Sequence, residues 1–383
     1  MIVANHGAPD YGSASHPKIA LDNVRVFNGH RILPPSTVII DGATIGTDAR
    51  GAKHIDGNGH ILLPGFIDTH CHPSTEDDLR QMTSYGITTA LLQSGTSPSE
   101  RAFLMNHHGL TDLRFGSVAA VVADSPSAIP PFLVENYLAS PEDARAFVAD
   151  QSASDWIKVL ALVTPDYATI TQPILDALVS AARGSGKATI VHASEYDSVH
   201  QALLASANQI HHSPIDRPAD GALAQLYLAG GQAFCPTLTA MQAIVESSPS
   251  AGYNFTAAVE SVTALYRGGV PILAGTDATQ LPGPPFQVPF GNSMHLELEL
   301  LVKAGMKELD ALRAATVLPA RYYGLHDRGR VEVGMRTDLV LVGCDPTKNI
   351  GCTRDIKRIW VAGVEFVAHE SPALTTNGWK EEL

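Results

Sequence analysis

The chain has 383 residues and a formal charge of −13 at pH 7, from 26 Lys and Arg against 39 Asp and Glu. A protein that neutralises nucleic-acid phosphates needs a basic face, so we expect no nucleic-acid partner. Hydrophobic residues make up 45% and charged residues 17% of the sequence, which is typical of a well-buried globular protein and excludes a disordered chain. The 16 histidines are the unusual feature of the composition.

The amino-terminal residues 1–17 contain no basic segment followed by an apolar stretch, so we predict no signal peptide. No part of the sequence approaches the roughly 18 consecutive apolar residues of a membrane helix. We therefore expect a cytoplasmic protein with no membrane partner. The cysteines are too few for a disulfide framework. We interpret them as packed or exposed thiols: Cys71, Cys235, Cys344 and Cys352.

Short β segments separated by turns occupy both ends of the chain. Residues 18–63 alternate polar and apolar side chains around Asp-Gly and Asn-Gly dipeptides, which predicts β-hairpins. Residues 329–343 and 356–368 show the same alternation around glycines. The sequence therefore predicts a small β-sheet module at each end of a different middle region.

Between residues 64 and 325, apolar stretches alternate with helical stretches rich in Ala and Leu. Continuous apolar stretches are typical of parallel strands that are buried on both faces. Eight such stretches in about 260 residues match the size of a (β/α)8 barrel. The clearest helical pattern covers 294–305 and 310–324, where we expect Pro319 to kink or end a turn. The predicted strands are 65–70, 88–93, 116–123, 156–162, 188–193, 208–213, 233–238 and 271–276.

His70 and His72 are two residues apart at the end of the first predicted strand, so both side chains point to the same side. Two neighbouring imidazoles could bind a divalent metal such as zinc, although an isolated His-x-His more often has a packing role. Four further candidates lie close to the carboxyl ends of later strands, where barrel enzymes place their active sites. These are Lys158, His192, His212 and Asp277.

These candidates lie in motifs by which the chain resembles the metal-dependent amidohydrolase superfamily, especially its imidazolonepropionase-like and Xaa-Pro dipeptidase-like members. The resemblance covers nearly the whole chain. It implies a (β/α)8 barrel over 64–325, a composite β-sandwich from 18–63 and 326–370, and tails at 1–17 and 371–383. The motifs are PGFIDTHCH (64–72), GITT (86–89), DWIKVL (155–160), IVHA (190–193), IHH (210–212), AGTDA (274–278), AATVLPARYYGL (314–325) and VEVGMRTDLVLV (331–342).

The resemblance implies two divalent metal ions, with Zn²⁺ the expected species. His70, His72 and Asp277 would bind the first ion, and His192 and His212 the second. Lys158 would bridge both ions. An ammonium group cannot bind a metal, but burial beside cations lowers the pKa of a lysine, and the neutral amine can then add carbon dioxide to form a carbamate. If Lys158 instead formed an ion pair, we would expect a single metal.

The implied chemistry is hydrolysis, in which a metal-activated hydroxide attacks a carbonyl carbon. Asp277 would accept the proton of the water and deliver it to the departing amine. We expect cleavage of an amide-type C–N bond in a lactam, an N-acyl amino acid or a peptide-like small molecule, placing the protein among hydrolases of C–N bonds other than peptide bonds. The alternatives are a lactonase, esterase or deaminase on the same site, or a non-catalytic interaction protein. We also expect a homo-oligomer.

His211 stands where members of this superfamily commonly carry an acidic residue. This departure leaves open which neighbour orients His212, and we expect His211 itself to face the barrel wall.

The segments after the later strands contain few basic residues. Residues 276–293 are rich in proline and lack Lys and Arg, which favours a stiff apolar lid. The insertion after the seventh strand is also apolar. We therefore expect a neutral or weakly anionic substrate with an apolar part, and basic side chains near the rim only at Arg101 and Arg217. The apolar residues of the insertion include Met241, Ile244, Tyr253 and Phe255.

Overall fold

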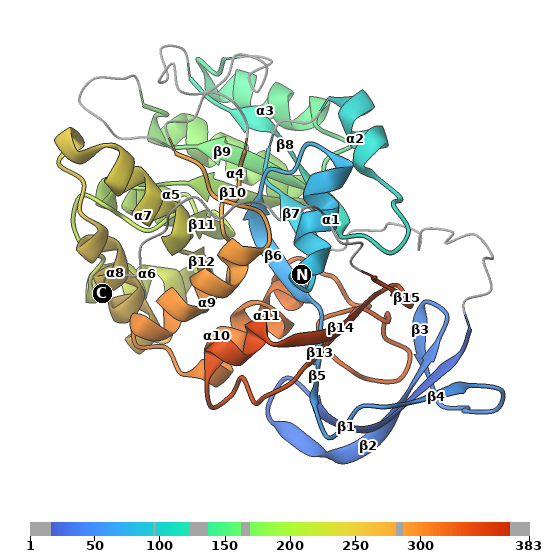
Figure 1. Cartoon of the computed structure of the whole chain (residues 1–383). Helices are drawn as coiled ribbons and strands as arrows, with labels where there is room; N and C mark the ends of the chain where they lie inside the picture. Colours follow the sequence, from blue (N-terminus) through green and yellow to red (C-terminus); the bar gives the residue numbers. More distant parts are fainter. Residues whose placement is uncertain (1–16, 95–96, 123–136, 162–168, 281–285, 368–383) are drawn as a thin grey trace.

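The computed structural model describes residues 17–94, 97–122, 137–161, 169–280 and 286–367. Figure 1 shows a barrel of parallel strands surrounded by helices, beside a sheet to which both ends of the described chain contribute. The architecture is that of a (β/α)8-type barrel with a separate strand domain, as the sequence predicts.

The strand domain is one eight-stranded sheet in the order β15-β14-β13-β5-β1-β2-β3, with β4 also paired to β1. Strand β5 lies between the amino-terminal and the carboxyl-terminal strands of this sheet, because it pairs in parallel with β1 and antiparallel with β13. Side chains that include Leu21, Leu62 and Trp360 form a separate hydrophobic core within this sheet. The strands are β1 (Ile19–Phe27), β2 (Ile32–Asp41), β3 (Thr44–Gly46), β4 (Lys53–Asp56), β5 (Ile61–Pro64), β13 (Leu339–Val342), β14 (Ile356–Val361) and β15 (Val364–Glu365).

One of the predicted hairpins is wrong. Strands β2 and β3 do form an antiparallel hairpin around an Asp-Gly turn. Strands β4 and β5 instead both pair in parallel with β1, each with a different half of it. A register shift divides β1 between Leu21 and Val24. The amide of Gly57, between β4 and β5, donates to the carbonyl of Asp22 (2.7 Å). This hydrogen bond lies at the register shift, where pairing with β1 passes from β4 to β5.

The barrel contains seven named parallel strands in the order β12-β11-β10-β9-β8-β7-β6. The predicted eighth strand closes the barrel through isolated parallel bridges, Phe234 to Ile272 and Cys71 to Ala278, and forms no regular strand. Part of the reason is that the amide of Ala274 donates to the carbonyl of Ala314 instead of a neighbouring strand. The strands are β6 (Phe66–Cys71), β7 (Ile87–Leu92), β8 (Asp112–Ala120), β9 (Trp156–Leu160), β10 (Ala188–His192), β11 (Gln209–His211) and β12 (Ala233–Cys235).

Helices pack around the outside of these strands, and the largest hydrophobic core lies between the two layers. Inside the barrel, a smaller apolar cluster that includes Ile67, Trp156, Ile190 and Tyr323 fills the space below the carboxyl ends of the strands. The helices are α1 (Glu76–Ser84), α2 (Pro98–Leu104), α3 (Pro141–Asp150), α4 (Gln172–Gly184), α5 (Tyr196–Leu204), α6 (Gly221–Gly230), α7 (Leu238–Ser247), α8 (Phe255–Arg267), α9 (Asn292–Lys303), α10 (Glu308–Ala314) and α11 (Val317–Tyr322), with short 3₁₀ helices η2 (Pro249–Ala251) and η3 (Ile350–Arg354).

Pro319 does not break a helix. The helical stretch is interrupted before it, at Ala315 and Thr316, and Pro319 lies in the first turn of α11. A proline is tolerated there because the amide of that turn has no partner within the helix. The insertion after β12 forms α7 and α8, and Met241 is buried in the main core. In the predicted lid, Phe290 is also buried in that core, while residues 281–285 lie outside the described residues.

Two of the four cysteines are not thiols, which corrects the prediction. Cys344 and Cys352 form a disulfide that links the end of β13 to η3. The pairing depends on a tight loop between them, in which Asp345 accepts hydrogen bonds from the amide and hydroxyl of Thr347 (3.1 and 2.6 Å). Cys71 and Cys235 are buried free thiols, as expected.

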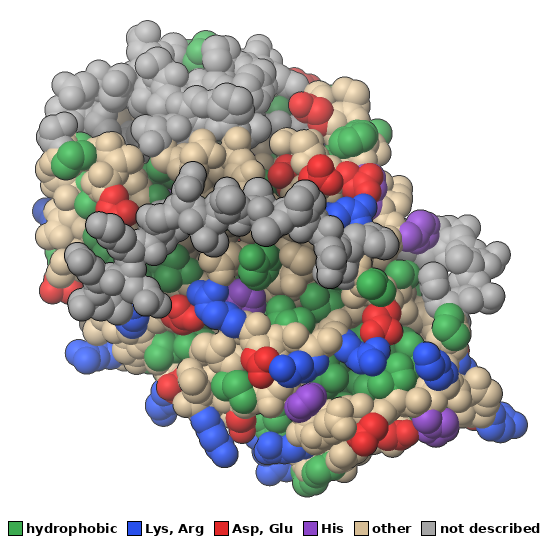
Figure 2. Space-filling model, viewed as in Figure 1, with side chains coloured by type: hydrophobic (Ala, Val, Ile, Leu, Met, Phe, Trp, Pro, Cys, Tyr) green, Lys and Arg blue, Asp and Glu red, His purple; other side chains and the backbone are tan. Residues whose placement is uncertain are grey.

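The described surface in Figure 2 carries Lys and Arg side chains interspersed with Asp and Glu, without a broad basic area on this face. None of the helices among the described residues is long and apolar enough to cross a membrane.

Candidate metal centre

The six predicted site residues come together at the carboxyl end of the barrel strands. His70 and Cys71 are the last two residues of β6, and His72 follows Cys71 directly. His192 is the last residue of β10, and His212 directly follows β11. The remaining two are Lys158 in β9 and Asp277 in the segment that closes the barrel.

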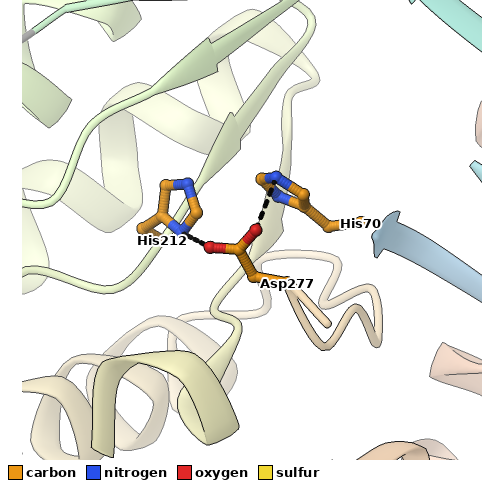
Figure 3. A group of neighbouring side chains, drawn as sticks. All are labelled: His70, His212 and Asp277. Atoms are coloured by element: carbon orange, nitrogen blue, oxygen red, sulfur yellow. Dashed lines mark ion pairs between the residues drawn. The ribbon is translucent and has the colours of Figure 1, made fainter. Parts of the chain in front are cut away.

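The carboxylate of Asp277 is the centre of the site. Its Oδ1 lies 3.0 Å from Nε2 of His72 and 3.3 Å from Nε2 of His70, and its Oδ2 lies 3.9 Å from Nδ1 of His212. Figure 3 shows the imidazoles of His70 and His212 approaching this carboxylate from two sides. Ligand atoms of His70, His212 and Asp277 all lie within 4.8 Å of one another, which is close enough for all three side chains to take part in one metal centre.

His192 and Lys158 are the remaining two candidates, and His192 packs against His212. The rings of His192 and His212 have centroids 4.1 Å apart. Lys158 is only 2% exposed, and its Nζ has no hydrogen-bond partner among the described residues. Burial lowers the pKa of Lys158 to about 8, so an appreciable share of this amine is neutral near physiological pH. A buried amine without a partner is costly unless another group satisfies it.

The imidazoles of His70, His192 and His212 are neutral near pH 7. Burial, and next the Lys158 ammonium, lower the pKa of His192 to about 3. Burial also lowers the pKa of His70 and of His212 well below the usual value, with contributions from Lys158 and neighbouring imidazoles. Metal ligands must be deprotonated, so this environment prepares the nitrogens to bind a cation.

Left-handed backbone conformations occur at the strand ends that carry these side chains. His212 has φ of 78°, Thr237 of 47° and Asp277 of 54°. Such conformations cost a non-glycine residue roughly 1–3 kcal/mol and are typical of functional sites. Thr237 is the neighbour that orients His212, because its Oγ1 lies 2.8 Å from Nδ1 of His212. The Nε2 of His212 has no partner among the described groups.

His211 does not face the barrel wall as predicted. It points into the barrel, with Nδ1 2.9 Å from Nδ1 of His70 and Nε2 3.2 Å from Oε1 of Gln209. The alternation of β11 places Gln209 and His211 inside and Ile210 in the outer core. The left-handed turn at His212 then breaks the alternation, so two consecutive histidines both face the site.

Asp68 is a site-supporting residue that the sequence reasoning missed. Its carboxylate accepts hydrogen bonds from the hydroxyl of Thr276 (2.7 Å), from the amide of Thr276 (3.1 Å) and from the amide of His70 (3.1 Å). Burial raises its pKa to about 7. Asp68 therefore ties β6 to the segment that carries Asp277. The sequence feature that could have identified Asp68 is an acidic residue within an otherwise apolar predicted strand.

The two arginines predicted near the rim behave differently. Arg101 contacts the carbonyl of Ala153 (2.5 Å) and lies 3.6 Å from Asp155, which places it by the amino end of β9 and not at the rim. Arg217 follows β11 at the carboxyl side, where it pairs with Asp197 and stacks on the ring of Tyr196.

Known proteins share both this sequence pattern and this fold. Imidazolonepropionase of Anaeromyxobacter dehalogenans is 23% identical over 407 aligned residues, which span 89% of this chain and 92% of that protein. Adenine deaminase of Gluconobacter oxydans is 23% identical over 349 aligned residues, spanning 85% of this chain and 55% of that protein. The crystal structure of a Xaa-Pro dipeptidase with bound methionine in the active site has the same fold, with a TM-score of 0.76, 19% identity, and coverage of 92% of this chain and 100% of that one. The model of the amidohydrolase family matches residues 61–365, a range that includes every candidate metal ligand, and the chain therefore belongs to the amidohydrolase family.

Proposed function

We propose that this protein is a metal-dependent hydrolase that cleaves an amide-type C–N bond in a lactam, an N-acyl amino acid or a peptide-like small molecule. The observation that carries the proposal is the buried carboxylate of Asp277, which faces Nε2 of both His70 and His72. Membership of the amidohydrolase family supports hydrolysis as the class of reaction.

The donor set fits divalent metal ions. Burial lowers the pKa of the His70, His192 and His212 imidazoles. The carboxylate of Asp277 faces the imidazoles of His70, His72 and His212, and Nε2 of His212 and Nζ of Lys158 are buried without a partner in the described structure. Nitrogen and oxygen donors of this kind suit Zn²⁺. We assign one ion to His70, His72 and Asp277, and a second to His192 and His212.

Lys158 would connect the two ion sites as a carbamate. The neutral amine would attack the carbon of carbon dioxide, so that an N–C bond forms while one C=O π bond breaks and its electron pair moves to oxygen, and the nitrogen would pass a proton to water. The product would be an anion with two oxygen donors, which divalent cations could stabilise at this buried position. When bound, the metal ions supply Lewis acidity and make water nucleophilic near neutral pH.

Asp277 is suited to move protons during the reaction. Its carboxylate oxygens lie among the imidazoles at the centre of the site, where they can accept a proton from the attacking water. The same carboxyl group then donates that proton to the departing nitrogen, which would otherwise leave as an unstable amide anion. The four histidines, His70, His72, His192 and His212, hold and orient the reacting groups.

The structural likeness to a Xaa-Pro dipeptidase favours a peptide-like amide within this range. Deamination is a second candidate, favoured by the adenine deaminase relative. The two reactions differ in product, because only deamination of a purine releases ammonia while keeping the ring intact.

Metal analysis and a substrate panel test the proposal. Protein expressed with added zinc is expected to hold about two equivalents per chain, as in other two-metal sites. The panel would contain lactams, N-acyl amino acids, Xaa-Pro dipeptides, esters and adenine, with ammonia measured separately. We expect amide hydrolysis that a chelator removes and zinc restores. A protein without bound metal and without hydrolysis of any amide would contradict the proposal.

A further inference from the structure

His211 forms a hydrogen-bonded chain with a candidate metal ligand. Its Nδ1 lies 2.9 Å from Nδ1 of His70, and its Nε2 lies 3.2 Å from Oε1 of Gln209. All three side chains are almost fully buried, at 1% exposure for Gln209, 0% for His211 and 2% for His70. Water therefore does not compete for these contacts.

The proton positions along this chain follow from the amide of Gln209. Its Oε1 can only accept, so Nε2 of His211 must donate. A neutral imidazole carries one proton, so Nδ1 of His211 is left as an acceptor. The short contact between the two Nδ1 atoms then requires His70 to donate from its Nδ1. A cationic His211 is disfavoured, because the ring is fully buried and no carboxylate contacts it among the described residues.

We propose that His211 is a positioning residue, which holds His70 in the tautomer whose Nε2 is free to bind a metal ion. This inference rests on the proposed metal-dependent function. The Nε2 atom of His70 is the one that faces Oδ1 of Asp277, at 3.3 Å. In the opposite tautomer, a proton on Nε2 would block that position. Partners of this kind fix both the tautomer and the orientation of a metal-binding histidine.

Substitutions at position 211 separate the hydrogen bond from packing. His211→Asn keeps an acceptor oxygen close to the position of Nδ1, whereas His211→Leu fills a similar volume without one. We expect His211→Leu to weaken zinc affinity by about 10–100-fold, and His211→Asn to bind zinc almost as tightly as the wild type. Affinity would be measured by competition with a chelator, and unfolding temperatures of the metal-free variants would be recorded beside it.

His295→Leu is the matched control. His295 is also fully buried and hydrogen-bonded, to Oγ1 of Thr353 (3.0 Å), but it contacts no candidate ligand in the described structure. This variant is expected to lower the unfolding temperature without changing zinc affinity. If zinc affinity fell only because the protein was less stable, His295→Leu would therefore lose zinc affinity as well.

Nuclear magnetic resonance of ¹⁵N-histidine-labelled protein reads the tautomers directly. We expect the proton of His70 on Nδ1 and that of His211 on Nε2, in both the metal-free and the zinc-loaded protein. The opposite assignment would overturn the proposal, as would equal zinc affinity of His211→Leu and wild type, or equal losses in the Leu and Asn variants.

If His211→Leu does not fold, the same comparison moves to position 209. Gln209→Glu keeps an acceptor for His211 and should retain zinc affinity. Gln209→Leu removes that acceptor and should bind zinc more weakly. Equal zinc affinities of these two variants would overturn the proposal. A wild-type protein that binds no zinc would contradict the proposed function as well, whereas a zinc-binding wild type with unaffected variants would contradict only the role of His211.

Discussion

Nε2 of His72 lies 3.0 Å from Oδ1 of Asp277, although the two residues come from the first and the last segment of the barrel. They meet because the barrel closes on itself, through the bridge from Cys71 to Ala278 and the hydrogen bonds of Asp68 to Thr276. The candidate metal centre is thus built on the closure of the barrel, so changes that loosen this closure should affect metal binding.

Asp277→Asn tests the proposed role in proton transfer. The amide keeps the size of the side chain but cannot accept and return a proton, so we expect kcat to fall by about 10²–10⁴-fold. Metal content should fall less than activity, because the histidine ligands remain. Kinetics with the substrate found in the panel and metal analysis of the same preparation check this. Full turnover in a metal-loaded Asp277→Asn protein would remove Asp277 from the mechanism.

Lys158→Ala tests the proposed bridge. We expect metal content to fall from about two equivalents to about one, with partial recovery of activity when formate or acetate supplies a carboxylate. Lys158→Arg should not recover, since a guanidinium fills the space. The native mass of the wild type should exceed the sequence mass by two zinc ions and one carbon dioxide, all of which acid would release.

Lys187→Ala is the control for this substitution. The Lys187 ammonium donates to backbone carbonyls that include those of Gln151 and Ser152 (2.8 and 2.9 Å), and it contacts no candidate ligand in the described structure. Its loss should leave metal content unchanged. Two equivalents of metal in Lys158→Ala would argue against a bridging role.

The convergence of the candidate residues could be predicted from the sequence because a barrel gathers strand ends at one rim. A position at the carboxyl end of a strand was enough to bring residues as distant as His70 and Lys158 together. The orientation of His211 was not predictable in this way. It depends on the left-handed backbone at His212, and nothing in the side-chain type of a histidine indicates that conformation.

Pairings in the strand domain were harder to predict for a different reason. Alternation identifies a strand but not its partner, so β4 and β5 looked like a hairpin although both pair with β1. The disulfide between Cys344 and Cys352 was missed because the sequence shows the spacing of two cysteines but not the loop that brings them together.

Asp112 should make stability depend on pH. Burial acts to raise its pKa, but Arg328 and Arg336, at 2.6 and 2.7 Å from its Oδ2, outweigh burial and hold the pKa well below the usual range. The carboxylate is thus more stable in the folded than in the unfolded state. Its contribution is present above the unfolded pKa of about 4 and is lost as the pH falls towards the folded pKa.

Asp112→Asn is expected to lower the free energy of unfolding by about 3 kcal/mol at pH 7, because it removes the buried carboxylate charge that Arg328 and Arg336 share. The difference from wild type should narrow below about pH 4. Urea unfolding at pH 7 and pH 3 measures both effects. Asp197→Asn, which affects an exposed pair with Arg217, should change little at either pH. If the difference in unfolding free energy between Asp112→Asn and wild type did not change with pH, the stabilisation would not come from the charge of Asp112.

The disulfide predicts a thiol count. In denaturant without reductant, two of the four cysteines, Cys71 and Cys235, should react with a thiol reagent, and all four should react after reduction. Closing this short loop is expected to contribute about 2–3 kcal/mol. Cys344→Ser with Cys352→Ser should therefore lower the unfolding temperature. Four reactive thiols before reduction would contradict the pairing and would agree with the cytoplasmic location expected from the sequence.

Gly275→Ala tests whether barrel closure supports the metal centre. A Cβ at this position would lie 2.6 Å from both Sγ of Cys235 and Oγ1 of Thr69, and 2.9 Å from the amide nitrogen of His70. Such overpacking should cost about 1–3 kcal/mol. Because the added methyl group also presses on His70, we expect weaker zinc affinity in addition to lower stability.

Gly221→Ala is the matched control for that substitution. Gly221 is the first residue of α6, and a Cβ there would meet no atom within 4 Å. Alanine is a better helix former than glycine, so this variant should be as stable as the wild type or slightly more stable, with unchanged zinc affinity. Chelator competition and thermal unfolding on both variants separate the two effects. If Gly275→Ala lost stability but bound zinc like wild type, barrel closure and metal binding would be independent, because the strain would then be absorbed at Cys235 and Thr69 without moving His70.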